Sequence, residues 1–478
     1  MHHYFPFKFQ SQKIIYSVLL VISLIPTYFI HSQKYPDWGD DFAQYIYQAQ
    51  QINSPSEDYK QVLNIEEYSS PKRSLAFSLL LSIISPTCSI QDYVGLISAC
   101  YILAGLCFFI FLSSHFSMAV SLIATLCVFY NFLFLRLKSE VVPEFLFIAL
   151  FYGILYLAFS SAKWVKFFIP VLLGIMVSVR FVGLSLIISY IIFIFIQNDK
   201  TLKQKLKNAA ICFLIFLLII AGINYFFLDQ INNQEVKLYG NLVFKNYSFN
   251  TFFENIILYS RYLLLFFEQE IPFWMNNIFK FSAVIFLSIG FFISIKNKVT
   301  IVHIALIVYF LFLFIYPYNG DTIKYLIPIF PLVLFFIIKG AYGLLDFIHF
   351  NRNDLLVFIC LSIILLSNSK TIKLAMEHKD LNIGPYDLSV LEDFEEIKNR
   401  VGRHESIAFG KPFIVNLLAD RHSYFLSKEN HSMVFSKATY FLSPKEKIRE
   451  LYPKIDGIKI AKGDTLELTN FYLVRLNQ

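Results

Sequence analysis

Long apolar runs fill most of residues 12 to 367 of this chain and limit the folds that it can adopt. About eleven of them approach the roughly 18 residues that a helix needs to cross the hydrocarbon core of a bilayer. Because backbone groups within lipid must hydrogen-bond inside their own segment, such runs are expected to be helices. They are predicted at 12–30, 93–112, 117–136, 143–160, 167–179, 181–197, 209–228, 279–295, 300–317, 323–345 and 354–368.

Composition agrees with a chain that lies largely in lipid. The 478 residues are 56% hydrophobic and 16% charged, whereas soluble domains carry about 25% charged residues. Much of the net charge of +7 lies in short loops between apolar runs, which indicates membrane topology rather than a nucleic-acid-binding surface. The sequence contains no CxxC pair, which argues against a disulfide framework and against a cysteine zinc site.

The basic residues of the short loops predict the orientation. With eleven spans, one side of the membrane collects most of them, and the positive-inside rule makes that side cytoplasmic. Residues 74–87 are short for a span and are expected to form an interfacial or re-entrant helix, since counting them as a span would break the charge pattern. The prediction is an N-terminus inside, a C-terminus outside, and outer loops at 31–92 and 229–278. The cytoplasmic residues would be Lys8, Lys13, Lys163, Lys166, Lys200, Lys203, Lys205, Lys207, Lys296, Lys298 and Arg352.

Two domains are expected. Residues 1–368 would form an all-α polytopic membrane domain, in which 12–30 is a retained first span. Residues 369–478 would form a small α/β domain outside the membrane. There, Leu388, Leu391, Phe394 and Ile397 recur every three residues and predict an amphipathic helix. Strands are predicted at 406–409, 433–435 and 471–476.

An acidic cluster of Asp37, Asp40 and Asp41 directly follows the first apolar run. On a helical wheel, Asp41, Gln44 and Gln48 share one face, which predicts an amphipathic helix along the membrane surface. A helix N-cap would explain Asp40 alone, but not three carboxylates within five residues beside lipid. One of them acting as a general base toward a hydroxyl is the functional alternative. A divalent cation held by the three carboxylates is possible chemically, although no metal is required by the pattern.

A second acidic pair, Glu140 and Glu144, flanks Pro143 at the head of the fourth apolar run. Interfacial anchoring would account for such charges, because they cost little at the membrane surface. Glu140 is the preferred partner of Asp40, since both are predicted on the same side of the membrane.

Several cations lie on the side that the positive-inside rule disfavours. Snorkelling to lipid headgroups would explain each one separately. Together they indicate an anionic ligand at the outer leaflet, for which a phosphate is the natural choice. The sequence lacks the phosphate loop and the other signatures of soluble nucleotide-dependent enzymes. The cations are Lys72, Arg73, Arg180, Lys324 beside Tyr325, and Arg261.

The order of these features resembles that of the GT-C superfamily of integral membrane glycosyltransferases, including the protein O-mannosyltransferases and the aminoarabinose transferases of lipid A. The tail adds Gly410-Lys411-Pro412 and Ala419–Tyr424, which are similar to the "KPR…TGR" segment of many bacterial members. In chain order, the segments that carry the resemblance are Gly39-Asp40-Asp41-Phe42 with Tyr45, Pro71, Glu140-x-x-Pro143, Arg180-Phe181-Val182-Gly183, and Lys324-Tyr325-Leu326-x-Pro328.

The resemblance implies transfer of a sugar from a polyprenyl-phosphate donor to a hydroxyl of a glycan, lipid or protein acceptor. The site would face the periplasm from a bacterial inner membrane, and the transfer would invert the anomeric configuration without a cofactor. Asp40 would be the base, with Asp41 as its rival, and Glu140 would be the second acidic residue. The phosphate would be held by Lys72 or Arg73, Arg180 and Lys324, where members of the family commonly carry Arg in place of Lys324.

Other classes of membrane protein remain as alternatives. A transporter or lipid flippase is expected to carry charges near the middle of its spans and repeated halves, and neither is visible in the sequence. An O-antigen polymerase or ligase would place its key residues in a large central outer loop, which 229–278 keeps open. A non-enzymatic scaffold would not need the carboxylates.

Overall fold

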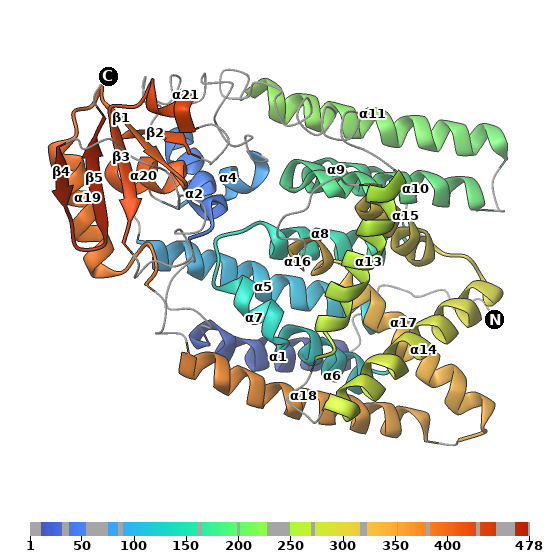
Figure 1. Cartoon of the computed structure of the whole chain (residues 1–478). Coiled ribbons are helices and arrows are strands. Elements are labelled where there is room, and N and C mark those ends of the chain that lie inside the picture. The colour runs from blue at the N-terminus through green and yellow to red at the C-terminus, as the bar shows by residue number, and fades with distance from the viewer. Residues whose placement is uncertain are drawn as a thin grey trace.

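The computed structural model describes most of the chain. Helices run through its first three quarters, and a small sheet lies near the C-terminus (Figure 1). The described residues are 11–30, 38–53, 75–84, 89–160, 162, 164–197, 201–226, 249–268, 273–315, 323–350, 352–378, 383–426, 431–445 and 464–476.

The apolar runs predicted from sequence coincide with helices. Each run contains one helix, or two in succession. The helical part comprises α1 (Ser11–Leu24), η1 (Ile25–Phe29), α2 (Asp40–Asn53), α4 (Leu75–Ser82), α5 (Ile90–Leu112), α6 (Met118–Phe129), α7 (Phe132–Lys138), α8 (Glu144–Leu157), α9 (Val165–Val179), η2 (Phe181–Gly183), α10 (Leu184–Ile196), α11 (Leu202–Phe226), α13 (Phe249–Leu265), α14 (Phe273–Asn297), α15 (Ile301–Ile315), α16 (Ile323–Leu326), α17 (Phe330–Phe347) and α18 (Asn353–His378).

Not every run is long enough to cross a bilayer by itself. Within the described segments, five helices have the length and apolar composition of a span, and α6 with α7 would make a sixth despite a 62° bend between them. The remaining runs form apolar helices of 10–17 residues. The α4 helix has eight residues, which is too short to cross a bilayer. The five spans are Ser11–Phe29, Ile90–Leu112, Leu202–Ile223, Trp274–Asn297 and Phe330–Phe347.

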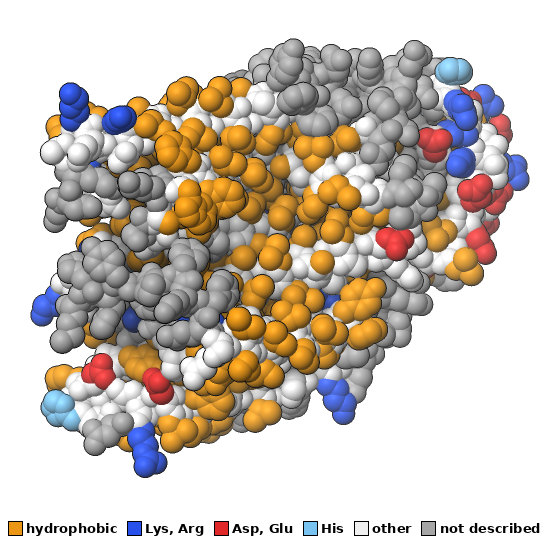
Figure 2. Space-filling model, turned by 180° about the vertical axis from the view of Figure 1, so that it is seen from behind, with side chains coloured by type: hydrophobic (Ala, Val, Ile, Leu, Met, Phe, Trp, Pro, Cys, Tyr) orange, Lys and Arg blue, Asp and Glu red, His pale blue; other side chains and the backbone are white. Residues whose placement is uncertain are grey.

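The surface of the helical part is typical of a multi-pass membrane protein. Apolar side chains spread across the middle of the molecule, while most charged side chains gather toward its two ends (Figure 2). Phe281, Phe292 and Leu366 are among the exposed large apolar residues of the helices. Lipid chains would solvate such a surface at no hydrophobic cost.

The helices α14 and α17 approach each other at backbone distance. A Cβ atom at Gly290 would overlap the carbonyl oxygen of Phe336, and one at Gly340 would overlap that of Phe286. Small residues at such crossings let helices pack closely within lipid, where burial alone provides little drive for association. This pair therefore depends on glycine for its geometry.

The helix α2 lies between the helical bundle and the C-terminal domain (Figure 1). It packs on α4, where the rings of Tyr45 and Phe77 meet at 4.9 Å and Ser78 Oγ donates to Gln48 Oε1 at 2.9 Å. Its expected polar face is buried, since Gln44 and Gln48 are only 5% and 4% exposed. A helix on an open membrane surface would leave this face in water, but here α4 and the C-terminal domain cover both sides.

The C-terminal domain is a five-stranded mixed sheet with helices. The strand order is β2-β1-β3-β5-β4, with β1 parallel to β2 and β3, and with β5 antiparallel to β3 and β4. The carboxylate of Asp393 accepts hydrogen bonds from the backbone N–H groups of Thr469 and Asn470, which joins the first helix to the last hairpin. The elements are α19 (Leu388–Arg400), β1 (Ser406–Phe409), α20 (Pro412–Ala419), β2 (His422–Phe425), α21 (His431–Phe435), β3 (Tyr440–Pro444), β4 (Thr465–Glu467) and β5 (Phe471–Arg475).

One detail differs from the sequence prediction. The strand expected at 433–435 is wrong, because these residues form the end of α21. Three consecutive apolar residues are too few to distinguish the period of a strand from that of a helix. Residues 369–378, which the sequence prediction assigned to the C-terminal domain, continue α18.

The contact between α14 and α17 gives a test of the fold. Gly290→Ala is expected to cost about 1–3 kcal/mol, because its added methyl group must push the two helices apart. The measurement is the midpoint of thermal unfolding in detergent. Gly153→Ala in α8 is the control, since a Cβ atom there meets nothing within 4 Å and should gain up to about 1 kcal/mol of helix propensity. Equal midpoints for the two variants would contradict the close packing.

Candidate active site

One ion pair connects α2 to α16, although 283 positions separate the two residues along the chain. The Nζ atom of Lys324 lies 2.6 Å from Oδ2 of Asp41, and both side chains are partly exposed. A carboxylate of the acidic cluster therefore meets a cation of the predicted phosphate-binding set.

A second ion pair is buried deeper. Arg180, between α9 and η2, donates through Nη1 to Oε1 of Glu144, the first residue of α8. Glu144 is 1% exposed and Arg180 is 12% exposed. Burial lowers the pKa of Arg180, but the charge of Glu144, together with smaller contributions from neighbouring tyrosines, raises the pKa above its usual value. The guanidinium is therefore a permanent positive charge.

Tyr325 joins the two ion pairs. It follows Lys324 in sequence, and the guanidinium of Arg180 lies 4.8 Å from the centre of its ring, a favourable cation–π arrangement. Its carbonyl oxygen accepts a hydrogen bond from the Tyr309 hydroxyl at 2.7 Å. Tyr152 similarly donates to the Pro328 carbonyl at 3.0 Å, so that α8 and α15 fix the segment that carries Lys324 and Tyr325.

Two buried polar atoms at this cluster have no hydrogen-bond partner among the residues that the structure describes. They are Oε2 of Glu144 and the hydroxyl of Tyr259 on α13. Tyr309 lies close enough to Arg180, Glu144, Tyr259 and Tyr325 to interact electrostatically with all four. Because buried polar groups are normally paired, these two atoms are available to a polar ligand.

The predicted site residues have different outcomes. Asp41, Arg180, Lys324 and Tyr325 come together in the cluster described above. Asp40 begins α2, but its side chain is outside the described part. The residues Asp37, Lys72 and Arg73 also lie outside the described residues.

Glu140 and Arg261 are described at other places. Glu140 lies partly exposed in the turn after α7, where its backbone N–H donates to the Leu137 carbonyl at 3.1 Å. Glu144, four residues later, is the acid that pairs with Arg180. Arg261 is exposed on α13, whereas Tyr259 on the same helix is fully buried at the cluster.

Sequence reasoning did not assign Glu144, Tyr259 or Tyr309 to the site. A carboxylate at the first position of an otherwise apolar helix, directly after Pro143, was a usable signal for Glu144. The tyrosines carried no such signal, because the chain contains 29 of them and most suit a membrane interface.

In the described part of the chain, which excludes Asp37 and the side chain of Asp40, no group of three or more His, Cys, Asp or Glu side chains is placed to hold a metal ion.

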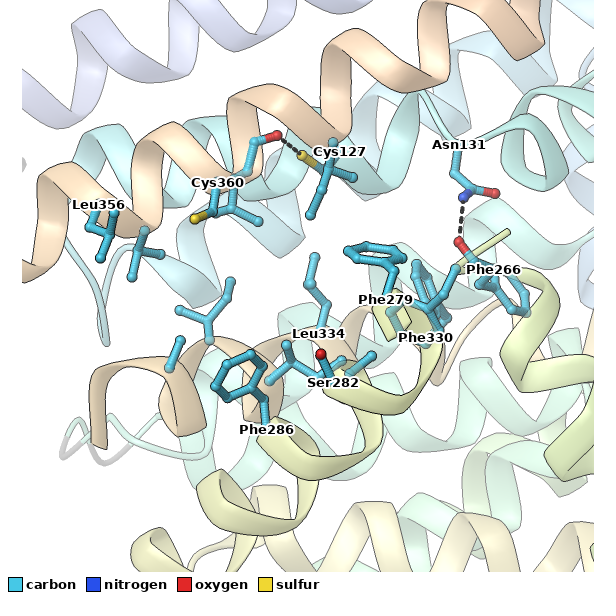
Figure 3. A pocket seen from close by; sticks show the side chains of 18 of the residues that line it. Cys127, Asn131, Phe266, Phe279, Ser282, Phe286, Phe330, Leu334, Leu356 and Cys360 are labelled. Atoms are coloured by element: carbon cyan, nitrogen blue, oxygen red, sulfur yellow. Dashed lines mark hydrogen bonds between the residues drawn. The ribbon is translucent and has the colours of Figure 1, made fainter. Parts of the chain in front are cut away.

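An apolar cavity of about 350 Å³ lies on another side of the bundle, between α14, α17 and α18. Figure 3 shows side chains of these helices pointing into it, with Asn131 and Phe266 at one end and Leu356 at the other. Two polar groups of its wall are engaged: Asn131 donates to the Phe266 carbonyl at 3.0 Å, and Cys127 donates to the Leu361 carbonyl at 3.0 Å. The cavity therefore suits an apolar guest.

The cavity begins close in sequence to the charged cluster. Phe330, which lines it, follows Lys324 by six residues and stacks on Phe266 with ring centroids 4.3 Å apart. Along α17, the lining residues reach from Phe330 to Leu345, a rise of about 22 Å for a helix. This length matches an extended hydrocarbon chain of a membrane lipid.

The buried ion pair gives a test of the cluster. Glu144→Gln leaves the charge of Arg180 uncompensated and is expected to lower the free energy of unfolding by about 3–5 kcal/mol. Adding Arg180→Met should recover part of this loss, because the unpaired charge is removed. Glu140→Gln is the control and should cost less, since Glu140 is partly exposed. Thermal unfolding in detergent measures all three, and equal effects of the two single variants would contradict the assignment.

Comparison with known proteins was made by sequence and by structure. No protein-family model and no curated protein matches the chain. ArnT from Cupriavidus metallidurans bound to undecaprenyl phosphate is similar in structure, with a TM-score of 0.58 and 10% identity over 97% of this chain and 98% of that chain. An oligosaccharyltransferase from Archaeoglobus fulgidus, in complex with Zn and sulfate, has a TM-score of 0.57 and 13% identity over 91% and 68% of the two chains.

A second structure of that oligosaccharyltransferase, tethered to an acceptor peptide, has a TM-score of 0.53 and 10% identity. At such identities the likeness concerns the fold and not individual residues. Both proteins are GT-C membrane glycosyltransferases, and the ArnT match extends over nearly the whole of both chains. The chain therefore has the fold of the GT-C superfamily, in agreement with the resemblance of its motifs.

Proposed function

We propose that this protein is a membrane glycosyltransferase that moves a sugar from a polyprenyl-phosphate donor to an acceptor hydroxyl. The observation that carries the proposal is the meeting of Asp41, Glu144, Arg180 and Lys324, from four separate segments, in one cluster beside apolar helices. The reaction needs a carboxylate for a proton and cations for a phosphate, and both are present there.

The transfer would be a single displacement. The acceptor oxygen attacks the anomeric carbon while a carboxylate takes its proton. The bond between this carbon and the phosphate oxygen breaks on the opposite side, and its electron pair leaves with the lipid phosphate. One displacement inverts the anomeric configuration and needs no covalent enzyme intermediate.

We assign the base role to Asp40 and a supporting role to Asp41. Asp41 is engaged by Lys324 at 2.6 Å, and this contact holds the first turn of α2 against α16. Asp40 precedes it at the start of the same helix. The proposed base and its supporting carboxylate would then be neighbours at the start of α2.

Arg180 and Lys324 would stabilise the departing phosphate. Of the three guanidinium nitrogens of Arg180, only Nη1 donates a hydrogen bond to a described residue. Further N–H donors of the guanidinium therefore remain for phosphate oxygens. Charge-assisted hydrogen bonds of this kind are shorter and stronger than neutral ones. Cations aimed at the charge that develops on the leaving group lower the barrier without a metal.

The donor's prenyl chain would occupy the apolar cavity between α14, α17 and α18. Its wall offers hydrocarbon and already paired polar groups, and its length of about 22 Å along α17 accommodates several isoprene units. The bound undecaprenyl phosphate in the similar structure of ArnT supports a donor of this class. The site would face the periplasm of a bacterial inner membrane, with a glycan, lipid or protein as acceptor.

The carboxylate and cation assignments predict the effect of single substitutions. Asp40→Asn should lower the turnover number about 10²- to 10⁴-fold, the range by which a general base accelerates a reaction. Asp41→Asn and Lys324→Met should each lower it by a smaller factor, because they remove support and phosphate binding. The measurement is release of labelled sugar from a polyprenyl-phosphate donor. Equal turnover in Asp40→Asn, Asp41→Asn and the unaltered protein would refute the carboxylate role.

The cavity assignment predicts a dependence on prenyl length. Ala283 lines the cavity, so that Ala283→Phe should raise the KM for a long-chain donor while leaving the KM for a short-chain donor nearly unchanged. Val284→Phe is the matched control, because the neighbouring residue on α14 is 46% exposed. If Ala283→Phe affects long and short donors equally, the prenyl chain lies elsewhere.

A further inference from the structure

The C-terminal domain contacts the chain immediately before the acidic residues of α2. Trp38 is 3% exposed. Its Nε1–H donates to the carbonyl oxygen of Ile383, in the segment that leads from α18 to α19, at 2.7 Å. Its ring meets Phe471 of β5 edge to face, with centroids 6.0 Å apart. A hydrogen bond and a ring contact thus tie this residue to the C-terminal domain.

Further contacts follow along α2. The ring of Phe42 lies 6.0 Å from that of Tyr386, which also belongs to the segment before α19. The pKa of Tyr386 is raised by burial, with a smaller contribution from Tyr93, which agrees with a closed interface. One turn beyond Phe42, Tyr47 packs against Leu417 of α20. The C-terminal domain therefore covers one full side of α2.

The opposite side of α2 rests on the membrane domain. Tyr45 packs on Phe77, and Gln48 accepts a hydrogen bond from Ser78, both from α4. Because every residue from 42 to 49 is buried, α2 cannot shift without disturbing one of its two neighbours. Its position is set jointly by α4 and the C-terminal domain.

Trp38 lies two residues before Asp40 and three before Asp41. It is buried against the C-terminal domain and its indole N–H is occupied by Ile383, so it has no group to offer a substrate. A change in the contacts of Trp38 would instead move the start of α2, together with the carboxylates of Asp40 and Asp41. A misplacement of about 1 Å can lower an enzymatic rate about 10²-fold.

We infer that Trp38 is a positioning residue, through which the C-terminal domain sets the location of the α2 carboxylates. This inference rests on the proposed function only in taking those carboxylates to be part of the active site. The placement of α2 itself is a property that is measurable without any substrate.

The test uses the full-length protein in detergent or nanodiscs. Trp38→Phe removes the N–H donor while keeping an aromatic ring beside Phe471. Phe471→Leu removes the ring contact from the side of the domain and keeps the Trp38 hydrogen bond. Trp274→Phe is the matched control, because Trp274 is 63% exposed on α14. Each variant is compared for amide hydrogen exchange and for kcat and KM of sugar transfer.

Trp38→Phe and Phe471→Leu are both expected to raise amide exchange in residues 40–53 about tenfold or more. For Trp38→Phe, exchange in β1 and β3 should stay as in the unaltered protein, whereas Phe471 also packs on Phe409 of β1. The turnover number should fall about 10- to 100-fold, with the KM for the donor changed by less than about twofold because Trp38 does not bind it. The control should match the unaltered protein in every measurement.

Three results would overturn the inference. They are unchanged exchange in α2 with unchanged kcat, a parallel rise of exchange in β1 and β3 for Trp38→Phe that indicates general destabilisation, and a loss confined to KM. If the unaltered protein transfers no sugar from any polyprenyl-phosphate donor, the proposed function fails. The exchange data then still decide whether Trp38 holds α2.

Discussion

The ion pair between Glu144 and Arg180 is the constraint on which the arrangement of this protein depends. A carboxylate that is 1% exposed at the head of an apolar helix is costly unless a cation compensates it. Arg180 meets this need from the turn between α9 and η2, and its face stacks on Tyr325. These contacts bring together the start of α8, the end of α9 and the short α16. Lys324 lies at the same place because it precedes Tyr325 in α16.

The charged cluster lies between the membrane domain and the C-terminal domain. In the membrane domain, helices pack through aromatic rings and through the contact of Gly290 with Gly340, which suits an apolar solvent. On the other side, the C-terminal domain with its mixed sheet packs against α2. Asp41 and Lys324 lie where these two parts meet and remain partly exposed, as groups that must reach a ligand should be. The apolar cavity lined by Phe330 lies within the membrane domain, between α14, α17 and α18.

The sequence predicted more of the architecture than of the site. Hydropathy located the apolar helices, since lipid leaves a backbone no alternative. It did not locate α13 (Phe249–Leu265), which lies within the outer loop expected at 229–278. The order of short motifs indicated the GT-C fold that the structural comparison then supported. Glu140 was preferred because it was predicted on the same side of the membrane as Asp40. Position along the chain does not separate it from Glu144, four residues later. Only the packing of α8 against the turn at Arg180 shows that Glu144 is buried, whereas Glu140 is partly exposed.

By itself, the sequence determined that this chain is a polytopic helical protein with acidic and basic groups at its membrane boundaries, because those properties follow from local composition and chain order. Tertiary structure decided which of these groups meet. Two contacts join positions far apart in the chain: the ion pair of Asp41 with Lys324, and the hydrogen bond from Trp38 to the Ile383 carbonyl. The burial of the polar face of α2 likewise depends on distant segments. Such contacts depend on how helices of similar hydropathy pack against one another. The local pattern of residues does not specify which helices become neighbours.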